Sequence, residues 1–365
     1  MFRKEKWEFK RLGEITTLRY GKNLTDKMRN SGDVPVYGSA GIVGWHNKSI
    51  TDSLTVIIAR KGSVGNIFIS ENPCFPIDTT FYIDQSSCEL NLRWLYIFLL
   101  GSDLKRLNMA TAVPGINRGI IQNIQIPLPP LEEQKQLVEL FQVIDQAIGQ
   151  INEQESKILD FKKYLLLDLF TGRKHFAHLI SKNDCELFKF EELAIQVSER
   201  VDPNKTDLKI YVGLEHLKSD NLMIEKTGSP DEVVGIKLKV SQGDIIFGKR
   251  RAYLRKVAVS HFNGIASAHS MILRANEKKI EKDFLPYFMQ SDEFMNRAVQ
   301  ISEGSLSPTI KWKTLAAQEF VLPQKDKQPQ LIGLFDQFDE TIVLLRKQKT
   351  NLKKLKQQLL NEILG

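Results

Sequence analysis

Basic and small polar residues cluster at two turn-like segments of this sequence. The first, RKGSVGN at residues 60–66, and the second, GKRRAYLR at residues 248–255, each follow a run of apolar, strand-forming residues. Arginine and lysine side chains bind phosphates, and short polar side chains beside glycine fit the grooves of a nucleic acid. A solvated turn without a ligand explains either segment equally well when taken alone. Because the same position is basic in both, binding of a nucleic acid is favoured.

Further polar residues join this set. Two histidines lie in polar loops, and polar or basic residues occupy a pair of segments that precede two helical regions. The resulting DNA-binding candidates are Arg60, Lys61, Ser63, Asn66, His46, Asn117, Arg118, Lys249, Arg250, Arg251, Tyr253, Arg255, His269, Ser307, Thr309 and Lys311.

Three short motifs that hint at catalysis lack essential parts. NPCF at residues 72–75 approaches the NPPF-type motif with which amino-methyltransferases hold an amine, but its second proline is missing and no glycine-rich cofactor loop accompanies it. GKNLT at residues 21–25 lacks the earlier glycine of a phosphate-binding loop. His175 and His178 are three residues apart without a third metal ligand. The sequence therefore predicts a protein with no catalytic or metal site.

Composition narrows the class of protein. The chain has 365 residues, enough for two or more domains, and a net charge of +7 that permits polyanion binding. Its longest apolar run, Trp94–Leu100, is far shorter than the roughly 20 residues of a membrane span. We see no signal peptide at the N-terminus. The three cysteines (Cys74, Cys88 and Cys185) lack any CxxC spacing, as expected of reduced thiols in a cytoplasmic protein.

The sequence contains an internal duplication at an offset of 194 residues. IPLPPLEEQKQLVELF (126–141) is repeated as FVLPQKDKQPQLIGLF (320–335), so that Leu128-Pro129 matches Leu322-Pro323 and, further on, Asp145 matches Asp339. Upstream the match is looser: TVIIARKGSVG (55–65) parallels GDIIFGKRRAY (243–253), and LYIFLLGSD (95–103) parallels LPYFMQSD (285–292). The chain is therefore two copies of one unit.

The better-matched part of each copy has a seven-residue apolar period, typical of a coiled-coil seam. The seam positions are Leu137, Ile144, Ile151, Ile158 and Leu165 in the first copy and Leu331, Phe338, Leu345, Leu352 and Leu359 in the second. Core helices of an ordinary bundle are the alternative, but two copies in register favour long paired helices. Prolines before Leu131 predict that the first helix begins there, and Thr171-Gly172 predicts its end.

Connectivity then predicts an architecture. To bury its seam on the first helix, the second helix must run back antiparallel to it, which brings the chain ends together. We expect an α+β fold in which a two-helix rod roughly 60 Å long separates two similar domains with pseudo-two-fold symmetry. The expected divisions are a first domain (1–130), a first helix (131–172), a second domain (173–326) and a second helix (327–365).

The domains themselves are rich in strand patterns. SLTVIIA (53–59), NIFIS (66–70) and CFPIDTTFYID (74–84) each predict one strand, and NLRWLYIFLLGSDLKRLN (91–108) predicts an amphipathic helix. The second copy repeats this order with GDIIFGKRRAYLRKVAVS (243–260) and a helix over DFLPYFMQSDEFMNRAV (283–299).

Taken together, these features resemble the specificity subunits of type I restriction–modification systems. The resemblance covers essentially the whole chain and is carried by WEFKRLGEI, PVYGSAGIVGWHN, VIIARKGSVGN and PLPPLEEQK…FTG. In the second copy LPQKDKQPQ replaces LPPLEEQKQ, which implies two unequal partner-binding surfaces. The resemblance implies that each domain is a target recognition domain for one half of a split DNA site and that the rod fixes the spacer.

The family resemblance also implies partners and cofactors. It implies binding to double-stranded DNA, to two modification subunits that carry S-adenosylmethionine and methylate adenine, and to a restriction subunit that uses ATP and Mg. No cofactor is expected in this chain. Two other functions stay open: a coiled-coil adaptor that never reads DNA, and a free-standing DNA enzyme, for which no cofactor or metal site is visible in the sequence.

Overall fold

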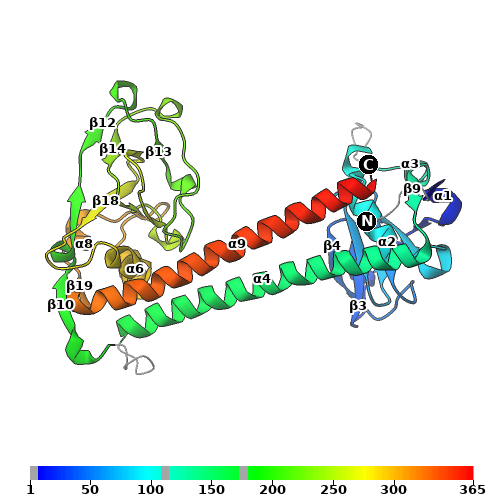
Figure 1. Ribbon diagram of the computed structural model, residues 1–365, viewed down its shortest axis with the longest axis horizontal. Helices are drawn as coiled ribbons and strands as arrows, with labels where there is room; N and C mark the ends of the chain where they lie inside the picture. Colours follow the sequence, from blue (N-terminus) through cyan, green and yellow to red (C-terminus); the bar gives the residue numbers. More distant parts are fainter. Residues whose placement is uncertain (1–6, 108–114, 172–179, 365) are drawn as a thin grey trace. The chain divides into compact units, whose positions relative to one another are not determined.

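The computed structural model describes residues 7–107, 115–171 and 180–364 (Figure 1). The chain divides into two compact units, of which the first is Met1–Asn152 with Arg346–Gly365 and the second is Glu153–Leu345. Two long helices, α4 (Leu131–Thr171) and α9 (Gln328–Leu364), each contribute a part to both units. Each unit therefore contains one globular domain and a stretch of both long helices.

The first unit contains short strands and short helices before α4. In chain order these are β1 (Glu8–Arg11), α1 (Leu12–Ile15), β2 (Arg19–Tyr20), η2 (Asp26–Met28), β3 (Val34–Gly38), β4 (Gly41–His46), β5 (Thr55–Ala59), β6 (Ile67–Ser70), β7 (Phe75–Pro76), β8 (Thr80–Asp84), η3 (Gln85–Ser87), α2 (Leu92–Gly101), η4 (Leu104–Leu107), α3 (Arg118–Gln122) and β9 (Gln125–Leu128). They form a four-stranded sheet of order β2-β8-β5-β6, a three-stranded sheet of order β4-β3-β7 and the ribbon β1-β9.

The second unit follows the same plan between α4 and α9. Its elements are η6 (Lys182–Asp184), β10 (Cys185–Lys189), α5 (Phe190–Leu193), β11 (Ala194–Val197), β12 (Arg200–Val201), η7 (Pro203–Lys205), β13 (Tyr211–Val212), η8 (Leu214–His216), η9 (Pro230–Glu232), β14 (Lys237–Val240), β15 (Ile245–Gly248), η10 (Ala252–Leu254), β16 (Val257–Val259), β17 (Gly264–Ala266), β18 (Ser270–Ala275), α6 (Phe284–Gln290), α7 (Asp292–Gln300), α8 (Trp312–Ala316), β19 (Glu319–Pro323) and η11 (Lys325–Lys327). Its sheets have the orders β11-β18-β15-β16 and β12-β14-β17-β13, and β10 pairs with β19.

The sheets confirm the α+β class and the duplication. The order β2-β8-β5-β6 in the first unit corresponds strand for strand to β11-β18-β15-β16 in the second. The ribbons correspond as well, because Arg11 pairs with Gln125 in one and Lys189 with Glu319 in the other. In both copies this ribbon joins the start of the domain to the strand that leads into a long helix.

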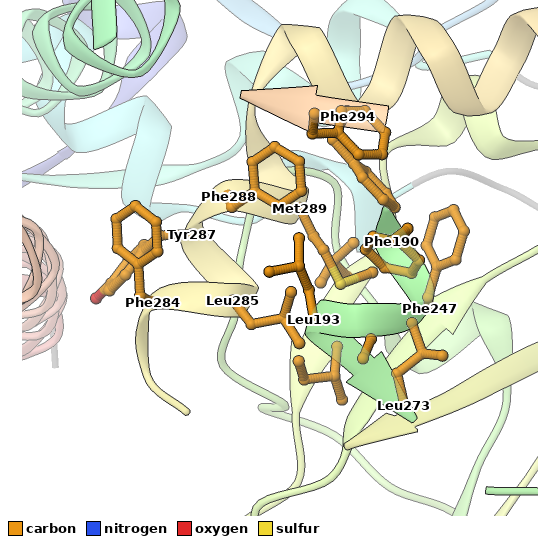
Figure 2. Close-up of a cluster of buried hydrophobic side chains, with 14 of the residues drawn as sticks. Phe190, Leu193, Phe247, Leu273, Phe284, Leu285, Tyr287, Phe288, Met289 and Phe294 are labelled. Atoms are coloured by element: carbon orange, nitrogen blue, oxygen red, sulfur yellow. The ribbon is translucent and has the colours of Figure 1, made fainter. Parts of the chain in front are cut away.

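Each domain is held by its own apolar core. In the second unit, helices α6 and α7 bury aromatic side chains against the sheet, and Figure 2 shows Phe190, Phe247, Phe288 and Phe294 converging from different elements. The Phe190 and Phe294 ring centres are 5.3 Å apart, and those of Phe247 and Phe294 are 5.5 Å apart. Such aromatic pairs add to the stabilisation that comes from burying apolar surface. This core fixes the strand ends from which the basic turn projects.

Within each unit the two long helices pack antiparallel, as predicted. In the first unit Leu137 near the start of α4 shares a core with Leu360 near the end of α9, while Asp145 further along α4 pairs with the earlier Lys356. In the second unit Leu165 shares a core with Leu331 and Phe335. The first described residue, Trp7, lies in the same core as Leu360 near the end of α9, in line with the expectation that the two ends of the chain lie close together.

The predicted seam residues face inward along both helices. Leu137, Ile144, Ile151, Leu165, Leu331 and Leu345 are buried, and Ile158, Phe338, Leu352 and Leu359 are half-buried. Flanking residues vary: Phe141 and Phe335 are buried, whereas Phe161 and Leu355 are 46% and 45% exposed. The seven-residue period therefore identified one line of inward-facing positions on each helix, which some neighbouring residues widen.

Three sequence predictions of single elements are wrong in detail. Residues 74–84 form two strands, β7 and β8, because a turn between them returns the amide of Thr80 to the carbonyl of Ile77. The helix predicted over 91–108 ends at Gly101, just before Asp103 adopts a positive φ of 40°. The helix predicted over 283–299 is broken into α6 and α7 at Ser291, whose side chain caps α7.

Candidate nucleic-acid interface

Three segments of the second unit meet at the end of β15. The segment 249–251 is hydrogen-bonded through its backbone to a loop before β18 and to the segment before α8. The bonds run from Ile310 N to Lys249 O at 3.0 Å, from Arg250 N to His269 O at 3.3 Å, and from Arg251 N to Pro308 O at 2.7 Å. Residues that are nearly sixty positions apart in the sequence therefore form one surface.

The side chains of these segments converge on one hydroxyl group. Nη2 of Arg250 donates to Oγ of Ser307 at 3.1 Å, and Nη2 of Arg251 approaches the same oxygen at 3.4 Å. The other terminal nitrogen of Arg250, Nη1, lies 3.2 Å from Nε2 of His269. The structure therefore brings together four of the predicted contact residues, from three separate segments.

Positive charge in this cluster is not neutralised within the unit. None of the ion pairs among the described residues involves Arg250 or Arg251. Burial and then the charge of Arg200 lower the pKa of Lys249. Burial and then the charges of Arg250, Lys249 and Lys237 lower the pKa of His269. Local positive potential of this kind attracts an anion.

Arg255 is a correction to the predicted set. Its Nε donates to Asp220 at 2.7 Å, its Nη1 lies 2.9 Å from Asp292, and its Nη2 donates to the carbonyl of Gln290 at 2.6 Å. Two carboxylates neutralise this guanidinium and hold it against α7. Arg255 therefore has a structural role, which the sequence did not indicate because both carboxylates lie more than thirty residues away along the chain.

The remaining candidates of the second unit differ in how accessible their side chains are to a ligand. Tyr253 is 53% exposed at the tip of η10. Lys311 is exposed, but its Nζ lies 2.6 Å from a carboxylate oxygen of Glu303. The hydroxyl of Thr309 donates to the carbonyl of Ser307 at 3.1 Å, which helps to shape the segment. Of these residues, Tyr253 is the one most available to a ligand.

The first unit builds the same backbone junction at the end of β5. The amide of Ile116 donates to the carbonyl of Arg60 at 3.0 Å, as Ile310 does to Lys249 in the second unit. Lys61 forms a bridge with Gly115, and Nδ2 of Asn66 donates to the carbonyl of Ser39 at 3.3 Å. Lys61 and Ser63 are exposed on this surface. Asn117 caps α3 by accepting from the amide of Gly119 at 2.9 Å, and the neighbouring Arg118 is half-buried.

Two candidates of the first unit are engaged inside the domain. The Arg60 guanidinium lies over the rings of Tyr20 and Phe81, at 5.0 Å and 5.3 Å from their centres, and donates to the carbonyl of Asp78 at 2.8 Å. His46 is buried, packs edge-on against Phe75 and accepts from the amide of Asn30 at 3.0 Å. Both side chains therefore stabilise the domain, and the predicted base contact at His46 is not supported.

A matched pair of buried glutamines attaches each domain to its long helix, and the sequence prediction overlooked both. Gln134 donates to the carbonyl of Pro129 at 2.9 Å and accepts from the amide of Asn91 at 3.3 Å. Gln328, 194 positions later, donates to the carbonyl of Pro323 at 2.8 Å and accepts from the amide of Glu281 at 2.8 Å. The duplication offset itself was the signal that would have found them.

A second matched pair joins the two helices. Lys162 and Asp339 form one ion pair, and Lys356 and Asp145 form the other, with each lysine and each aspartate separated by 194 positions. The first of these pairs is more buried, and the Lys162 ammonium also lies 4.8 Å from the ring centre of Tyr287. The same interaction therefore occurs once in each unit with the helix roles exchanged.

The described residues support neither a metal site nor a reactive cysteine. Within residues 7–107, 115–171 and 180–364, no group of three or more His, Cys, Asp or Glu side chains could hold a metal ion. His175, His178 and Gly172 lie outside these residues. Cys74, Cys88 and Cys185 are free thiols, and burial raises the pKa of each. Across the described chain no helix is both long and apolar enough to cross a membrane.

The fold and this interface define a duplicated α+β protein with a basic loop surface in each copy and a pair of long antiparallel helices. Residues 4–159 match the family model of the type I restriction modification DNA specificity domain. This part of the chain is therefore a DNA specificity domain of that family, and relatives that match the chain more extensively are specificity subunits of type I restriction enzymes.

Individual relatives support this assignment over most of the chain. The MjaVIII specificity subunit of Methanocaldococcus jannaschii is 27% identical over 293 residues, which cover 74% of this chain and 69% of that protein. The EcoDI specificity subunit of Escherichia coli is 24% identical over 382 residues, which cover 94% and 84%. The crystal structure of a type I S subunit from M. genitalium has the same fold, with a TM-score of 0.64 at 16% identity, covering 100% of this chain and 99% of that one.

Proposed function

We propose that this chain is the DNA-reading subunit of a type I restriction–modification complex. Each domain would read one half of a bipartite site through the loops that meet at the ends of β5 and β15. The observation that carries the proposal is a backbone hydrogen bond that occurs in both domains, from Ile116 to Arg60 and from Ile310 to Lys249. It presents a polar loop surface at the same place in each copy of the duplicated unit, in a chain that matches the DNA specificity domain family. Because the loops of the two copies differ in sequence, the target would be non-palindromic.

The remaining activities would belong to partner subunits. We place S-adenosylmethionine on two modification subunits that dock on α4 and α9, and ATP and Mg on a restriction subunit joined through the complex. The chain itself would hold no cofactor and contribute specificity rather than catalysis. A role on chromosomal DNA also places it in the cytoplasm.

The test is the pattern of DNA methylation in cells that carry this chain with its modification subunit. Single-molecule sequencing should detect adenine methylation at one split motif, and deletion of the gene for this chain should abolish it. A methylation pattern without any bipartite motif would exclude the proposed function. The purified chain alone should show neither methyltransferase nor nuclease activity.

The long helices would set the distance between the two half-sites. Removing one heptad from each helix, residues 151–157 and 345–351, keeps the seam period and shortens both helices by roughly 10 Å at about 1.5 Å per residue. We expect the complex to prefer a shorter spacer or to lose activity, since bending DNA to compensate costs on the order of 1–6 kcal/mol. An unchanged spacer in the methylated motif would contradict this role.

A further inference from the structure

The Ser307 hydroxyl is shared by two guanidinium groups, and neither of them has a carboxylate partner among the described residues. Arg250 and Arg251 approach its oxygen from neighbouring positions, at 3.1 Å and 3.4 Å. A neutral hydroxyl stabilises a guanidinium far less than an anion does, and the planar donor fork matches phosphate oxygens in particular. The arrangement therefore resembles an anion site in which a hydroxyl holds the two arginines in place.

The backbone at this point is held in an uncommon conformation. Arg251 has φ of +57°, in the left-handed region that a side chain other than glycine or asparagine rarely adopts. Its amide donates to the carbonyl of Pro308 at 2.7 Å, which secures this geometry. Here the effect of the conformation is to direct Arg251 towards the same hydroxyl as Arg250.

His269 completes the cluster in a defined protonation state. A guanidinium can only donate hydrogen bonds, so Nε2 of His269 accepts from Nη1 of Arg250 and the ring is neutral. The charged groups that face the ring are Arg250, Lys249 and Lys237, all of them positive. They disfavour a proton on this histidine as long as no anion is present.

We propose that Arg250, Arg251, His269 and Ser307 form one binding site for a phosphodiester of the DNA backbone, and that filling this site takes up a proton at His269. The inference rests on the DNA-reading function proposed above. The phosphate oxygens accept the donor groups of Arg250 and Arg251. Nε2 of His269 then takes one proton from solvent, and the resulting imidazolium becomes a further donor to the phosphate.

The described residues of the first unit do not repeat the arginine pair or the histidine. Lys61 corresponds to Arg250 and Gly62 to Arg251, because Lys61 bridges Gly115 as Arg250 bridges Thr309. The amide of Lys61 donates to the carbonyl of Thr79, where that of Arg250 donates to the carbonyl of His269. The counterpart of Ser307, residue 113, lies outside the described residues. The proton-linked phosphate contact is therefore proposed for the second domain, and the two domains would contribute unequally to the electrostatic part of DNA affinity.

The experiment measures binding of the full chain, in complex with its modification subunit, to a duplex that carries the methylated motif. The wild-type complex should bind more tightly as the pH falls from 8 to 5.5, by up to about tenfold per pH unit where His269 titrates. His269→Gln should abolish this component, so that the affinity of the variant at pH 5.5 and at pH 8 agrees within about threefold. The matched control is His261→Gln, which changes an exposed histidine outside the cluster and should keep the pH dependence.

The arginines are tested by salt dependence and by a variant that separates binding from folding. Replacing Arg251 with glycine suits the left-handed backbone, so Arg251→Gly should not lower the thermal unfolding midpoint. It should nevertheless weaken DNA binding by roughly tenfold and reduce the slope of log affinity against log salt by about 0.9. Lys278→Ala, which removes an exposed charge outside the cluster, should leave that slope unchanged.

The possible outcomes separate this inference from the proposed function. If the wild-type complex binds no DNA sequence specifically at any pH, the proposed function fails and the inference falls with it. If the wild-type complex binds its motif but His269→Gln keeps the full pH dependence, or Arg251→Gly binds as tightly as wild type, only the phosphate site is overturned. Loss of the pH dependence together with the reduced salt slope supports it.

Discussion

The ion pair between Lys162 and Asp339 should respond unequally to the loss of its two partners. The lysine side chain is 8% exposed and the aspartate side chain 34% exposed, with Nζ and Oδ1 separated by 2.6 Å. The Tyr287 hydroxyl lies 2.7 Å from Asp336 and 3.1 Å from Asp339, so it provides a donor to either carboxylate. The aspartate therefore has water and a tyrosine to replace its partner, whereas the lysine is enclosed.

These exposures set the expected magnitudes. Breaking a fully buried pair by removing one partner costs about 3–5 kcal/mol. Asp339→Ala leaves the ammonium of Lys162 enclosed without its partner, and we expect a loss of about 3 kcal/mol because the site is open on the aspartate side. Lys162→Met keeps most of the packing and leaves a carboxylate that water reaches, so we expect about 1 kcal/mol. The corresponding pair in the first unit, Asp145 and Lys356, is more exposed and should contribute less than about 1 kcal/mol.

The assay is urea-induced unfolding of the full chain, followed by circular dichroism. The free energies of unfolding for Asp339→Ala, Lys162→Met, Asp145→Ala and the wild type should fall in the order that these exposures predict. Equal losses for Asp339→Ala and Lys162→Met would refute the argument from burial. So would a loss for Asp145→Ala as large as that for Asp339→Ala, since the two carboxylates occupy matched positions in the duplication.

Three further predictions concern other residues. Gln328→Ala leaves the amide of Glu281 and the carbonyl of Pro323 without partners and should cost about 2 kcal/mol in urea unfolding, whereas the exposed Gln330→Ala should cost almost nothing. Arg255→Ala should destabilise the second unit by about 2 kcal/mol, whereas Arg250→Ala should chiefly weaken DNA binding in a filter-binding assay. Because burial lowers the pKa of Lys162, there is a pH window below 10.5 in which the unfolded chain keeps a proton that the folded chain has lost. In that window the free energy of unfolding should gain a component that rises with pH, and Lys162→Met should remove it.

The duplication offset made the helical parts of this chain predictable. Once Leu137 and Leu331 are aligned, the same offset relates Gln134 to Gln328 and Lys162 to Lys356. These residues make the same contacts in both units, because the fixed helical period determines which face of the helix each residue occupies and few other elements contact that face. The antiparallel direction likewise followed from connectivity and burial of the seam.

The roles of individual arginines could not be predicted in this way. Arg60 and Arg255 both lie in basic turns, yet each is held by groups that only the folded domain brings near. For Arg60 these are rings on β2 and β8, and for Arg255 they are carboxylates at Asp220 and Asp292. Sequence spacing gives the charge of a turn but not the tertiary partner that neutralises or covers it. The break at Ser291 was missed for a similar reason. Serine is only mildly unfavourable inside a helix, and the folded structure alone shows that its side chain accepts from the amide of Phe294 and so begins a new helix.

The basic turns at residues 60–66 and 248–255 share a backbone arrangement but differ in their side chains, which is how one duplicated scaffold can read two different half-sites. Ile116 and Ile310 fix the backbone of each turn through the same hydrogen bond, so the scaffold presents both turns in the same way. What differs is the pair of residues that follows: Arg250 and Arg251 in the second unit correspond to Lys61 and Gly62 in the first. Ser307 contacts both arginines through its hydroxyl alone, so a change of that side chain can release them without disturbing the backbone junction. Substitutions at 307 should consequently alter DNA binding far more than they alter stability, which is the behaviour expected of a position that tunes recognition.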